Sequence, residues 1–373
     1  MAYIHELKNW PHFTWKAEAF LEQLNETRQK QARLLWGMNA LGFPIRAEAG
    51  LETLTIEAVK SCAIEGENLD PAQVRSSLAL RLGLPRGGAS TGGRAVEGLA
   101  EMMLDATRNF AEPLSAERLW GWQAALFPTG YSGLRKISVG SWRGPEAGPM
   151  QVVSGPIGRE NVHFEAPAAD RLEIEMKTFL EWFNGRSEAD PLIKAGIAHI
   201  WFVTIHPFED GNGRIARAIA DCALARADGC PDRFYSMSAQ IERERKNYYS
   251  VLEASQRGPL DITPWLQWFM GCLGRAIDQA EDMLSGVMQR AHYWQLASQF
   301  PLNQRQLQIL PRLVDGLEGK LTSGKYAKLA KCSTDTALRD LQKLVEFGLL
   351  AHGEGGGRSR CYVLSKGKEG GQG

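Results

Sequence analysis

One short segment of the chain gathers residue types that could bind a polyphosphate. It covers residues 206–217 and reads HPFEDGNGRIAR. Gly211 and Gly213 permit a tight turn whose backbone N–H groups can form an anion nest. Arg214 and Arg217 lie three residues apart, so a helix would present both guanidinium groups on one face. Two such groups beside a nest suit a polyphosphate rather than a single phosphate.

Three further side chains of this segment extend the chemistry that it could perform. Asn212 could donate a side-chain N–H to a phosphate oxygen. Asp210 offers hard carboxylate oxygens beside the nest, which suit a Mg²⁺ ion that bridges phosphates. His206, four residues before Asp210, is a residue type that can remove a proton near neutral pH. Each residue alone has a structural interpretation, as part of a turn or an ion pair, but their order and spacing together favour a nucleotide site.

Helices must position this segment. An apolar run with helical spacing over 195–205 precedes it, and a second helical run over 215–227 follows it. The sequence therefore predicts a helix–loop–helix in which the loop enters a helix N-terminus. The positive end of that helix dipole would add to the anion nest.

The surrounding chain of 373 residues predicts a mainly α protein of two to three domains. Short β-branched runs between 137 and 167, separated by Gly and Pro, are interpreted as a β-hairpin inserted among the helices. A glycine-rich stretch over 83–98 predicts a linker. Helical spacing precedes that linker in three segments: 15–41, 51–69 and 71–82.

The C-terminal residues 301–373 differ from the rest in charge. They carry 12 Lys plus Arg against 7 Asp plus Glu, whereas the whole chain balances 43 against 43. Their predicted order of helix, turn, helix, strand, glycine-rich turn and strand is that of a winged helix-turn-helix. The module could bind DNA or protein, and the sequence leaves both open. Seven basic residues could face DNA phosphates: Lys325, Lys328, Lys331, Arg339, Lys343, Arg358 and Arg360.

The segment 206–217 resembles the motif of the Fic family (filamentation induced by cAMP), His-x-Phe-x-(Asp/Glu)-Gly-Asn-Gly-Arg-x-x-Arg, at every specified position. The resemblance covers about residues 94–275 and implies a Fic-type helical core with a β-hairpin flap. The opening residues 3–13 and the C-terminal winged helix resemble those of one bacterial Fic subgroup. The implied activity is adenylylation (AMPylation), in which a Tyr, Thr or Ser hydroxyl of a target protein attacks the α-phosphorus of ATP and pyrophosphate leaves.

The resemblance also implies a role for each motif residue. His206 would be the general base, and Asp210 would hold Mg²⁺ on the α and β phosphates. Residues 211–213 (Gly211, Asn212 and Gly213) would form the anion hole, while Arg214 and Arg217 would bind the outer phosphates. Such a reaction depends mostly on positioning and charge stabilisation.

A tyrosine downstream of the motif lines the adenine pocket in the family, which implies that role for Tyr248. The family often has an asparagine eight residues later, where this sequence has Gln256. Packing of Tyr248 and Tyr249 in a helical core is the alternative interpretation.

The segment from Ser61 to Gly66 resembles the family's inhibitory pattern, (Ser/Thr)-x-x-x-Glu-(Gly/Asn). Ser61 and Glu65 are four residues apart and would share one helix face. The resemblance implies that Glu65 pairs with Arg217 and blocks productive binding of the γ-phosphate. An exposed helical carboxylate without a regulatory role is the structural alternative.

The predicted hairpin resembles the family's flap, which binds the target segment as an added strand through backbone hydrogen bonds. Residues 162–164 and the segment of Gln151, Val152 and Val153 are the candidate flap strands, and the latter three are the candidate target-docking residues. His163 is interpreted as a surface residue of the flap rather than as a second base.

The sequence therefore predicts four parts: an N-terminal helical region with the inhibitory helix (1–93), a Fic core (94–275), a connecting helix (276–300) and a winged helix (301–373). The expected partners are ATP with Mg²⁺ and a target protein, and the family resemblance allows a homodimer. Six dispersed cysteines and a polar N-terminus predict a cytoplasmic protein without a membrane span. Two alternatives stay open: a DNA-binding regulator with a nucleotide-sensing Fic core, and an enzyme that removes AMP from targets.

Overall fold

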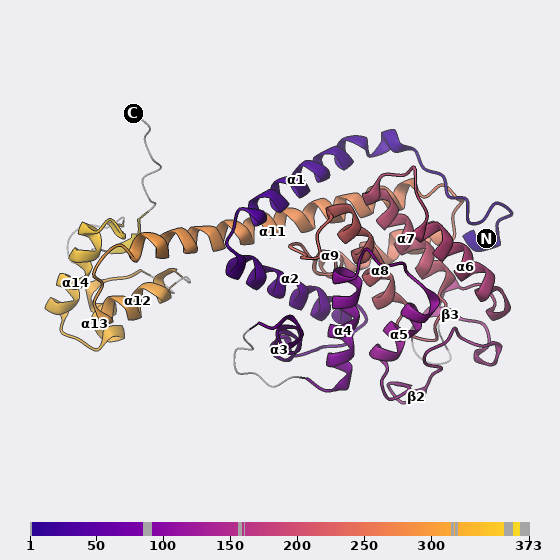
Figure 1. Ribbon diagram of the computed structural model, residues 1–373, viewed down its shortest axis with the longest axis horizontal. Coiled ribbons are helices and arrows are strands. Elements are labelled where there is room, and N and C mark those ends of the chain that lie inside the picture. Colours follow the sequence, from indigo (N-terminus) through magenta and orange to yellow (C-terminus); the bar gives the residue numbers. More distant parts are fainter. Residues whose placement is uncertain are drawn as a thin grey trace. The chain divides into compact units, whose positions relative to one another are not determined.

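The computed structural model is mainly helical, with three short antiparallel hairpins in the described part of the chain (Figure 1). The mainly α fold that the sequence predicts is thereby confirmed. The chain separates into two compact units, Met1–Glu281 and Asp282–Gly373. The structure describes residues 2–84, 92–155, 159, 161–314, 317, 320–353 and 361–365.

The N-terminal helices differ in their bounds from the predicted segments. Helix α2 begins at Phe43, eight residues earlier than predicted, because Pro44 is accepted in the first turn of a helix. It ends at Ile64, since Gly66 adopts a positive φ of 86° that a helix cannot continue. Helix α3 has the predicted bounds, with Asp70 as its N-cap. The three helices are α1 (Leu21–Asn39), α2 (Phe43–Ile64) and α3 (Pro71–Leu82).

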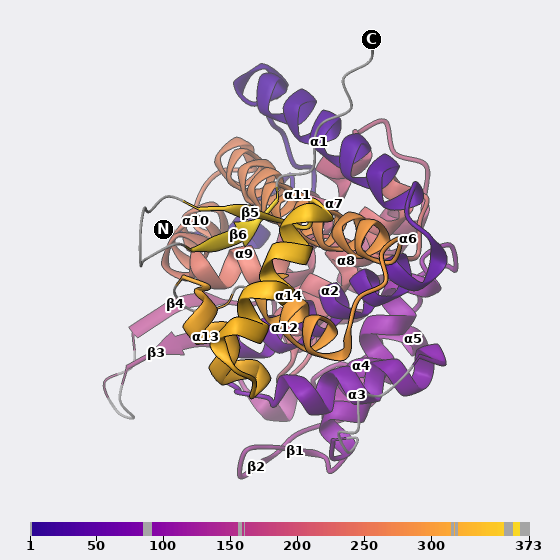
Figure 2. The same cartoon turned by 90° about the vertical axis from the view of Figure 1, so that its left-hand side faces the viewer.

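The remaining helices of the first unit surround a buried pair, α7 and α8, which lie near its centre (Figure 2). Helix α7 is apolar on all faces, as expected for a helix enclosed by others. At Gly196 an added Cβ would lie 3.1 Å from Phe269, so the glycine permits close packing against α11. The helices are α4 (Arg94–Arg108), α5 (Ala116–Leu126), α6 (Leu172–Asn184), α7 (Pro191–Ile205), α8 (Asn212–Asp228), α9 (Met237–Arg243), α10 (Arg245–Gln256) and α11 (Thr263–Ala297).

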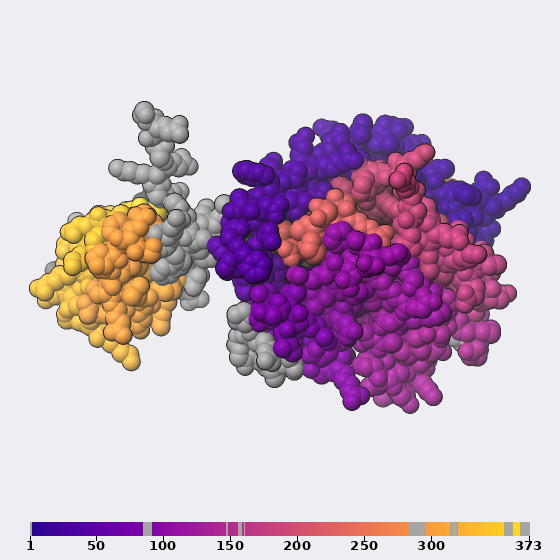
Figure 3. Space-filling view, viewed as in Figure 1, coloured from indigo at the N-terminus to yellow at the C-terminus, as the bar shows by residue number. Residues whose placement is uncertain are grey.

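Two hairpins belong to the first unit. The predicted flap is present as β3 (Gln151–Ser154) and β4 (Asn161–Glu165), paired antiparallel with an irregularity after Val152. Residues 137–139, which the sequence placed among the β-branched runs, form no strand. A shorter hairpin that the sequence did not indicate lies just before them, as β1 (Tyr131–Ser132) and β2 (Arg135–Lys136). Figure 3 shows α1 and α2 (indigo) along one border of this face and α3–α5 (purple to magenta) below them.

The second unit has its own apolar core. Three helices and a two-stranded hairpin follow one another in the predicted order: α12 (Gln304–Val314), α13 (Ser323–Ala330), α14 (Thr334–Glu346), β5 (Leu350–His352) and β6 (Tyr362–Leu364). Ala337, Leu341 and Leu344 form the buried face of α14. Assignment of the unit as a winged helix stays a prediction, and two of its proposed DNA contacts, Arg358 and Arg360, lie outside the described residues. Among the helices described, none combines the length and apolarity that a membrane span requires.

Candidate active site

The loop between α7 and α8 holds the residues of the Fic-like segment in two unusual backbone conformations. His206 ends α7 with a left-handed φ of 53°, and Gly211 precedes α8 with a φ of 88°. The side chain of Asn212 closes the loop, because its Oδ1 accepts from Phe208 N (3.0 Å) and its Nδ2 donates to Phe208 O (2.8 Å). The Asn212 amide thus braces the loop, and its donation to a phosphate stays a prediction.

The His206 imidazole is poised to accept a proton. Its Nδ1 lies 3.1 Å from Val203 O, and because a carbonyl can only accept, Nδ1 carries the proton and Nε2 holds a lone pair. Burial, with a smaller contribution from the positive charge of Arg143, lowers the pKa of His206 to about 4. The ring is therefore neutral at pH 7. It lines a cavity of about 1200 Å³ together with Glu65, Gly213 and Tyr248.

Arg143 holds this loop from outside the motif. Its Nε donates to His206 O (2.9 Å), its Nη2 donates to Pro167 O, and its backbone N–H donates to Pro207 O (2.9 Å). Burial lowers the pKa of this guanidinium to about 10, so it stays charged. The sequence analysis missed Arg143, since a single arginine 63 residues before the loop carries no local pattern.

Glu65 lies directly over the first turn of α8. Its Oε1 is 2.8 Å from Arg217 Nη2, and an added Cβ on Gly213 would lie 2.2 Å from the same oxygen. Ser61 also contacts Arg217, through its Oγ at 2.9 Å from Nε and its carbonyl oxygen at 2.8 Å from Nη2. The Arg217 side chain is only 3% exposed. The structure thus brings the three predicted residues Ser61, Glu65 and Arg217 together, and Gly66 follows at the end of the helix.

A second carboxylate from the same segment reaches the other arginine. Glu67 accepts from Arg214 Nη1 through both of its oxygens, at 3.0 and 2.8 Å. The Arg214 guanidinium also lies 5.0 Å from the centre of the Phe127 ring. The Glu67 side chain is 49% exposed, against 4% for Arg214. Sequence reasoning missed Glu67, although its place two residues after Glu65 was the available signal.

Asp210 lies between the loop and the β1–β2 hairpin. Its Oδ2 accepts from Ser132 Oγ, its Oδ1 accepts from Gly211 N (2.5 Å), and Arg214 Nη2 lies 3.7 Å away. A Mg²⁺ ion commonly binds through one or two carboxylates plus substrate phosphates and keeps several waters. A lone Asp210, 41% exposed beside the anion nest, fits such an ion. The described residues contain no cluster of three or more acidic, His or Cys side chains that could hold a metal alone.

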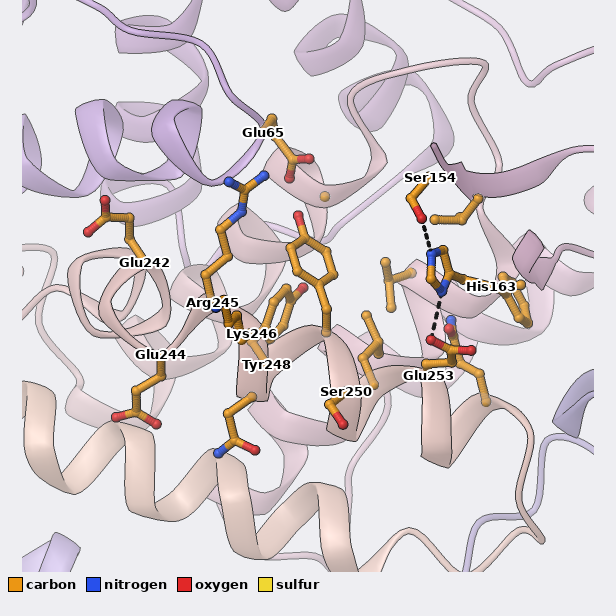
Figure 4. A pocket seen from close by; sticks show the side chains of 18 of the residues that line it. Glu65, Ser154, His163, Glu242, Glu244, Arg245, Lys246, Tyr248, Ser250 and Glu253 are labelled. Atoms are coloured by element: carbon orange, nitrogen blue, oxygen red, sulfur yellow. Dashed lines mark hydrogen bonds and ion pairs between the residues drawn. The ribbon is translucent and has the colours of Figure 1, made fainter. Parts of the chain in front are cut away.

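Tyr248 on α10 lines the same cavity but is itself buried. Its hydroxyl lies 2.9 Å from His199 Nε2. Burial lowers the pKa of His199 to about 3 and raises that of Tyr248, so both side chains are neutral and hold each other in place. Gln256, eight residues later at the end of α10, donates to Thr204 Oγ1 (3.2 Å). Tyr248 packs in the core and also borders the cavity (Figure 4), and its role in an adenine pocket stays a prediction.

The flap forms another wall of the cavity. Val152 and Val153 line it, whereas Gln151 donates to Glu165 Oε2 (2.8 Å) across the hairpin. Arg257, just after α10, holds β4 by donating to Val162 O (2.6 Å) and to His163 O (2.8 Å). The flap is therefore anchored to the helix that carries Tyr248.

Comparisons with known proteins agree with this fold. Residues 113–224 match the Fic/DOC family, and residues 3–84 match a domain of unknown function, DUF4172. Solved structures similar to this chain include a Fic family protein from Desulfovibrio desulfuricans G20 (22% identical, covering 95% of this chain and 98% of that one, TM-score 0.54). Another is a Fic domain containing signaling protein from Bacteroides thetaiotaomicron (20% identical, 71% and 97% covered, TM-score 0.52). Residues 113–224 of the chain therefore form a Fic/DOC family domain.

Two curated relatives match the central part of the chain. Protein adenylyltransferase Fic of Nematostella vectensis is 34% identical over 114 residues, which are 30% of this chain and 25% of that protein. The protein of the same name from Drosophila melanogaster is 32% identical over 114 residues, 30% of this chain and 22% of that protein. The matched segment thus spans about a quarter of the length of these relatives. Membership of the bacterial subgroup stays a prediction.

Proposed function

We propose that the protein is an autoinhibited adenylyltransferase that transfers AMP from ATP to a hydroxyl group of a target protein. The observation that carries the proposal is the neutral His206, whose unprotonated Nε2 lies in a cavity bordered by the first turn of α8. A base and an anion nest in one cavity are what a hydroxyl attack on a phosphate ester requires. The relatives named protein adenylyltransferase support the same reaction class.

In this proposal the chain binds the triphosphate of ATP at the start of α8. The N–H groups of Asn212, Gly213 and Arg214 have no intrahelical acceptor and would donate to phosphate oxygens. Arg214 and Arg217 would hold the outer phosphates, and Asp210 would hold Mg²⁺ against the α and β phosphates. A bound Mg²⁺ supplies charge neutralisation at the phosphates. His206 would take the proton of the target hydroxyl as it attacks.

The state described here is the inhibited one in this proposal. Both guanidinium groups that would bind the outer phosphates already have carboxylate partners, Glu65 on Arg217 and Glu67 on Arg214. Glu65 also covers Gly213, so that its negative charge lies where a phosphate would bind. ATP can bind productively only when these carboxylates move away.

The target would bind along the flap, where Val152 and Val153 face the cavity. Addition of a strand through backbone hydrogen bonds reads little of the target sequence. The flap would therefore align a hydroxyl with His206 without restricting the target to one motif.

Replacement of Glu65 tests the proposal. With ATP labelled on its α-phosphate, we expect the variant Glu65→Gly to transfer label to protein about 10- to 100-fold faster than the unchanged chain, because it loses a charged hydrogen bond worth about 1.5–3 kcal/mol. The matched control is the double variant Glu65→Gly, His206→Ala, which should bind ATP equally well and transfer no label to a target protein.

Each contrary result has a distinct meaning. If Glu65→Gly transfers label no faster than the unchanged chain, Glu65 is not inhibitory. ATP binding without any transfer would favour the nucleotide-sensing regulator. Release of AMP from labelled proteins, lost in Glu65→Gly, would favour an enzyme that removes AMP.

A further inference from the structure

Three side chains outside the nucleotide loop form a continuous hydrogen-bonded row on the flap side of the cavity. Ser154 Oγ lies 2.6 Å from His163 Nε2, and His163 Nδ1 lies 2.8 Å from Glu253 Oε2 (Figure 4). Ser154 ends β3, His163 is on β4, and Glu253 is on α10. The fold thus places residues from three elements in the order serine, histidine, carboxylate.

The acceptors fix the direction of these hydrogen bonds. The Glu253 carboxylate can only accept, so Nδ1 of His163 carries a proton, and in the neutral form of the ring Nε2 then holds a lone pair. The Ser154 hydroxyl therefore donates to Nε2. A hydroxyl bonded to a base that is oriented by a third group is the arrangement that activates a serine nucleophile.

The row lines the same cavity as the nucleotide loop. Ser154, His163 and Glu253 border it together with His206 and Gly213. Its volume of about 1200 Å³ exceeds the roughly 300–1,000 Å³ of ordinary small-molecule sites. The cavity therefore has room for a nucleotide and for an attacking side chain at once. Ser154 is exposed, while Arg257 fixes the backbone of β4 beside it.

The other hydroxyl groups on the cavity wall lack this activation. Tyr248 is buried and bonded to His199, and Tyr249 donates to Ile64 O (3.4 Å). Ser250 is exposed, but among the described residues its side chain has no histidine as a hydrogen-bond partner, and it lies apart from His163 in Figure 4. Ser154 is thus set apart from Tyr248 by its exposure, and from Tyr249 and Ser250 by its histidine partner.

We propose that Ser154 is a self-adenylylation site of this chain, activated by His163 and Glu253. The inference rests on the proposed function, since it takes ATP as the donor. The Ser154 Oγ–phosphorus bond forms at the α-phosphate, and the bond from that phosphorus to the bridging oxygen of the β-phosphate breaks. The hydroxyl proton passes to His163 Nε2, and pyrophosphate leaves with the bridging oxygen. The product is an AMP ester on the flap.

The experiment uses the full-length Glu65→Gly variant, incubated with ATP and Mg²⁺ and mapped by peptide mass spectrometry. We expect one AMP group on Ser154, and none there in Ser154→Ala. His163→Gln should lower the rate at Ser154 about 100-fold or more, as the loss of a general base does. Ser250→Ala is the matched control and should leave the Ser154 rate unchanged. Because Ser154 and Ser250 are both exposed, neither alanine variant should alter the melting temperature.

Four results would each contradict the inference or one part of it. Labelling at other residues without any at Ser154 would refute the site and leave the adenylyltransferase proposal standing. Equal rates in His163→Gln would refute activation by the row. No labelling of any protein by Glu65→Gly would remove the proposed function, and the inference with it. For transfer within one chain, the labelled fraction should grow at a rate that does not depend on protein concentration. A rate proportional to protein concentration would refute transfer within one chain.

Discussion

The loop between α7 and α8 and the flap border one cavity but differ in how firmly other residues hold them. In the loop, polar groups are bonded to other protein groups. The Asn212 side chain is bonded to Phe208, and the backbone carbonyl of His206 accepts from Arg143. The flap is a two-stranded hairpin with exposed residues along β3, and side chains at the C-terminal end of α10 anchor its second strand. Fixed groups lower the cost of stabilising charge on a phosphate. A lightly anchored strand suits a varying protein partner.

The largest effect should follow from breaking the loop. Asn212→Ala leaves Phe208 N–H and C=O buried without their partners, which costs about 1–3 kcal/mol for each group. We expect a melting temperature lower by about 5–15 °C and no label transfer. Calorimetry of the variant against the unchanged chain measures the first. An unchanged melting temperature would show that the loop holds its shape without this amide.

Loss of the Arg257 contacts to the flap should lower label transfer and leave the stability of the protein unchanged. Arg257→Met removes the hydrogen bonds to Val162 O and His163 O, and it should lower label transfer in the Glu65→Gly background about two- to tenfold. ATP affinity and melting temperature should not change. Arg75→Met, which removes a half-buried arginine of α3 that pairs with Glu48, is the matched control. A lower ATP affinity in Arg257→Met would mean that the flap also shapes the nucleotide site.

The two carboxylates that pair with Arg217 and Arg214 offer an intermediate comparison on the loop side. Glu65 is 31% exposed and Glu67 is 49% exposed, so solvent screens the second ion pair more strongly. We expect Glu67→Gln to raise ATP affinity about two- to fivefold, and Glu65→Gln to raise it more. Titration calorimetry of both variants measures the difference. A larger gain from Glu67→Gln would make Arg214, not Arg217, the main point of inhibition.

The smallest effect should be the response of His206 to mild acid. Its pKa of about 4 keeps the ring neutral between pH 7.5 and 5.5, because a lowered pKa extends the neutral form to lower pH. We expect an NMR resonance of this ring, assigned with His206→Asn, to stay constant over that range. A midpoint near 6.5, the ordinary value for histidine, would show that the ring is solvated.

Local signals made part of this molecule predictable. The bounds of α3 follow from Asp70, Pro71 and Gly83, and the helix–loop–helix follows from an apolar run that ends before two glycines. The pair of Glu65 and Arg217 was predictable only through the family resemblance. Nothing in local spacing indicates their contact across 152 residues.

The contacts that the sequence did not reveal join residues far apart in the chain. Arg143 contacts His206 from 63 residues away, Glu67 contacts Arg214 across 147, and Ser132 contacts Asp210 across 78. Such pairs depend on tertiary packing and leave no period in the sequence. Asn212 shows a different limit: its residue type suited either a phosphate or the loop, and only the folded backbone decides between them.

The left-handed backbone of His206 has a consequence for the evolution of this chain. A residue with a Cβ in this backbone conformation destabilises the fold by roughly 1–2 kcal/mol relative to glycine. The hydrogen bond from Arg143 to the His206 carbonyl holds the backbone in that conformation. Mutation to glycine would relax the backbone while discarding the imidazole. A more stable protein without this imidazole is therefore one substitution away, so His206 gives up backbone stability for a side chain that can accept a proton.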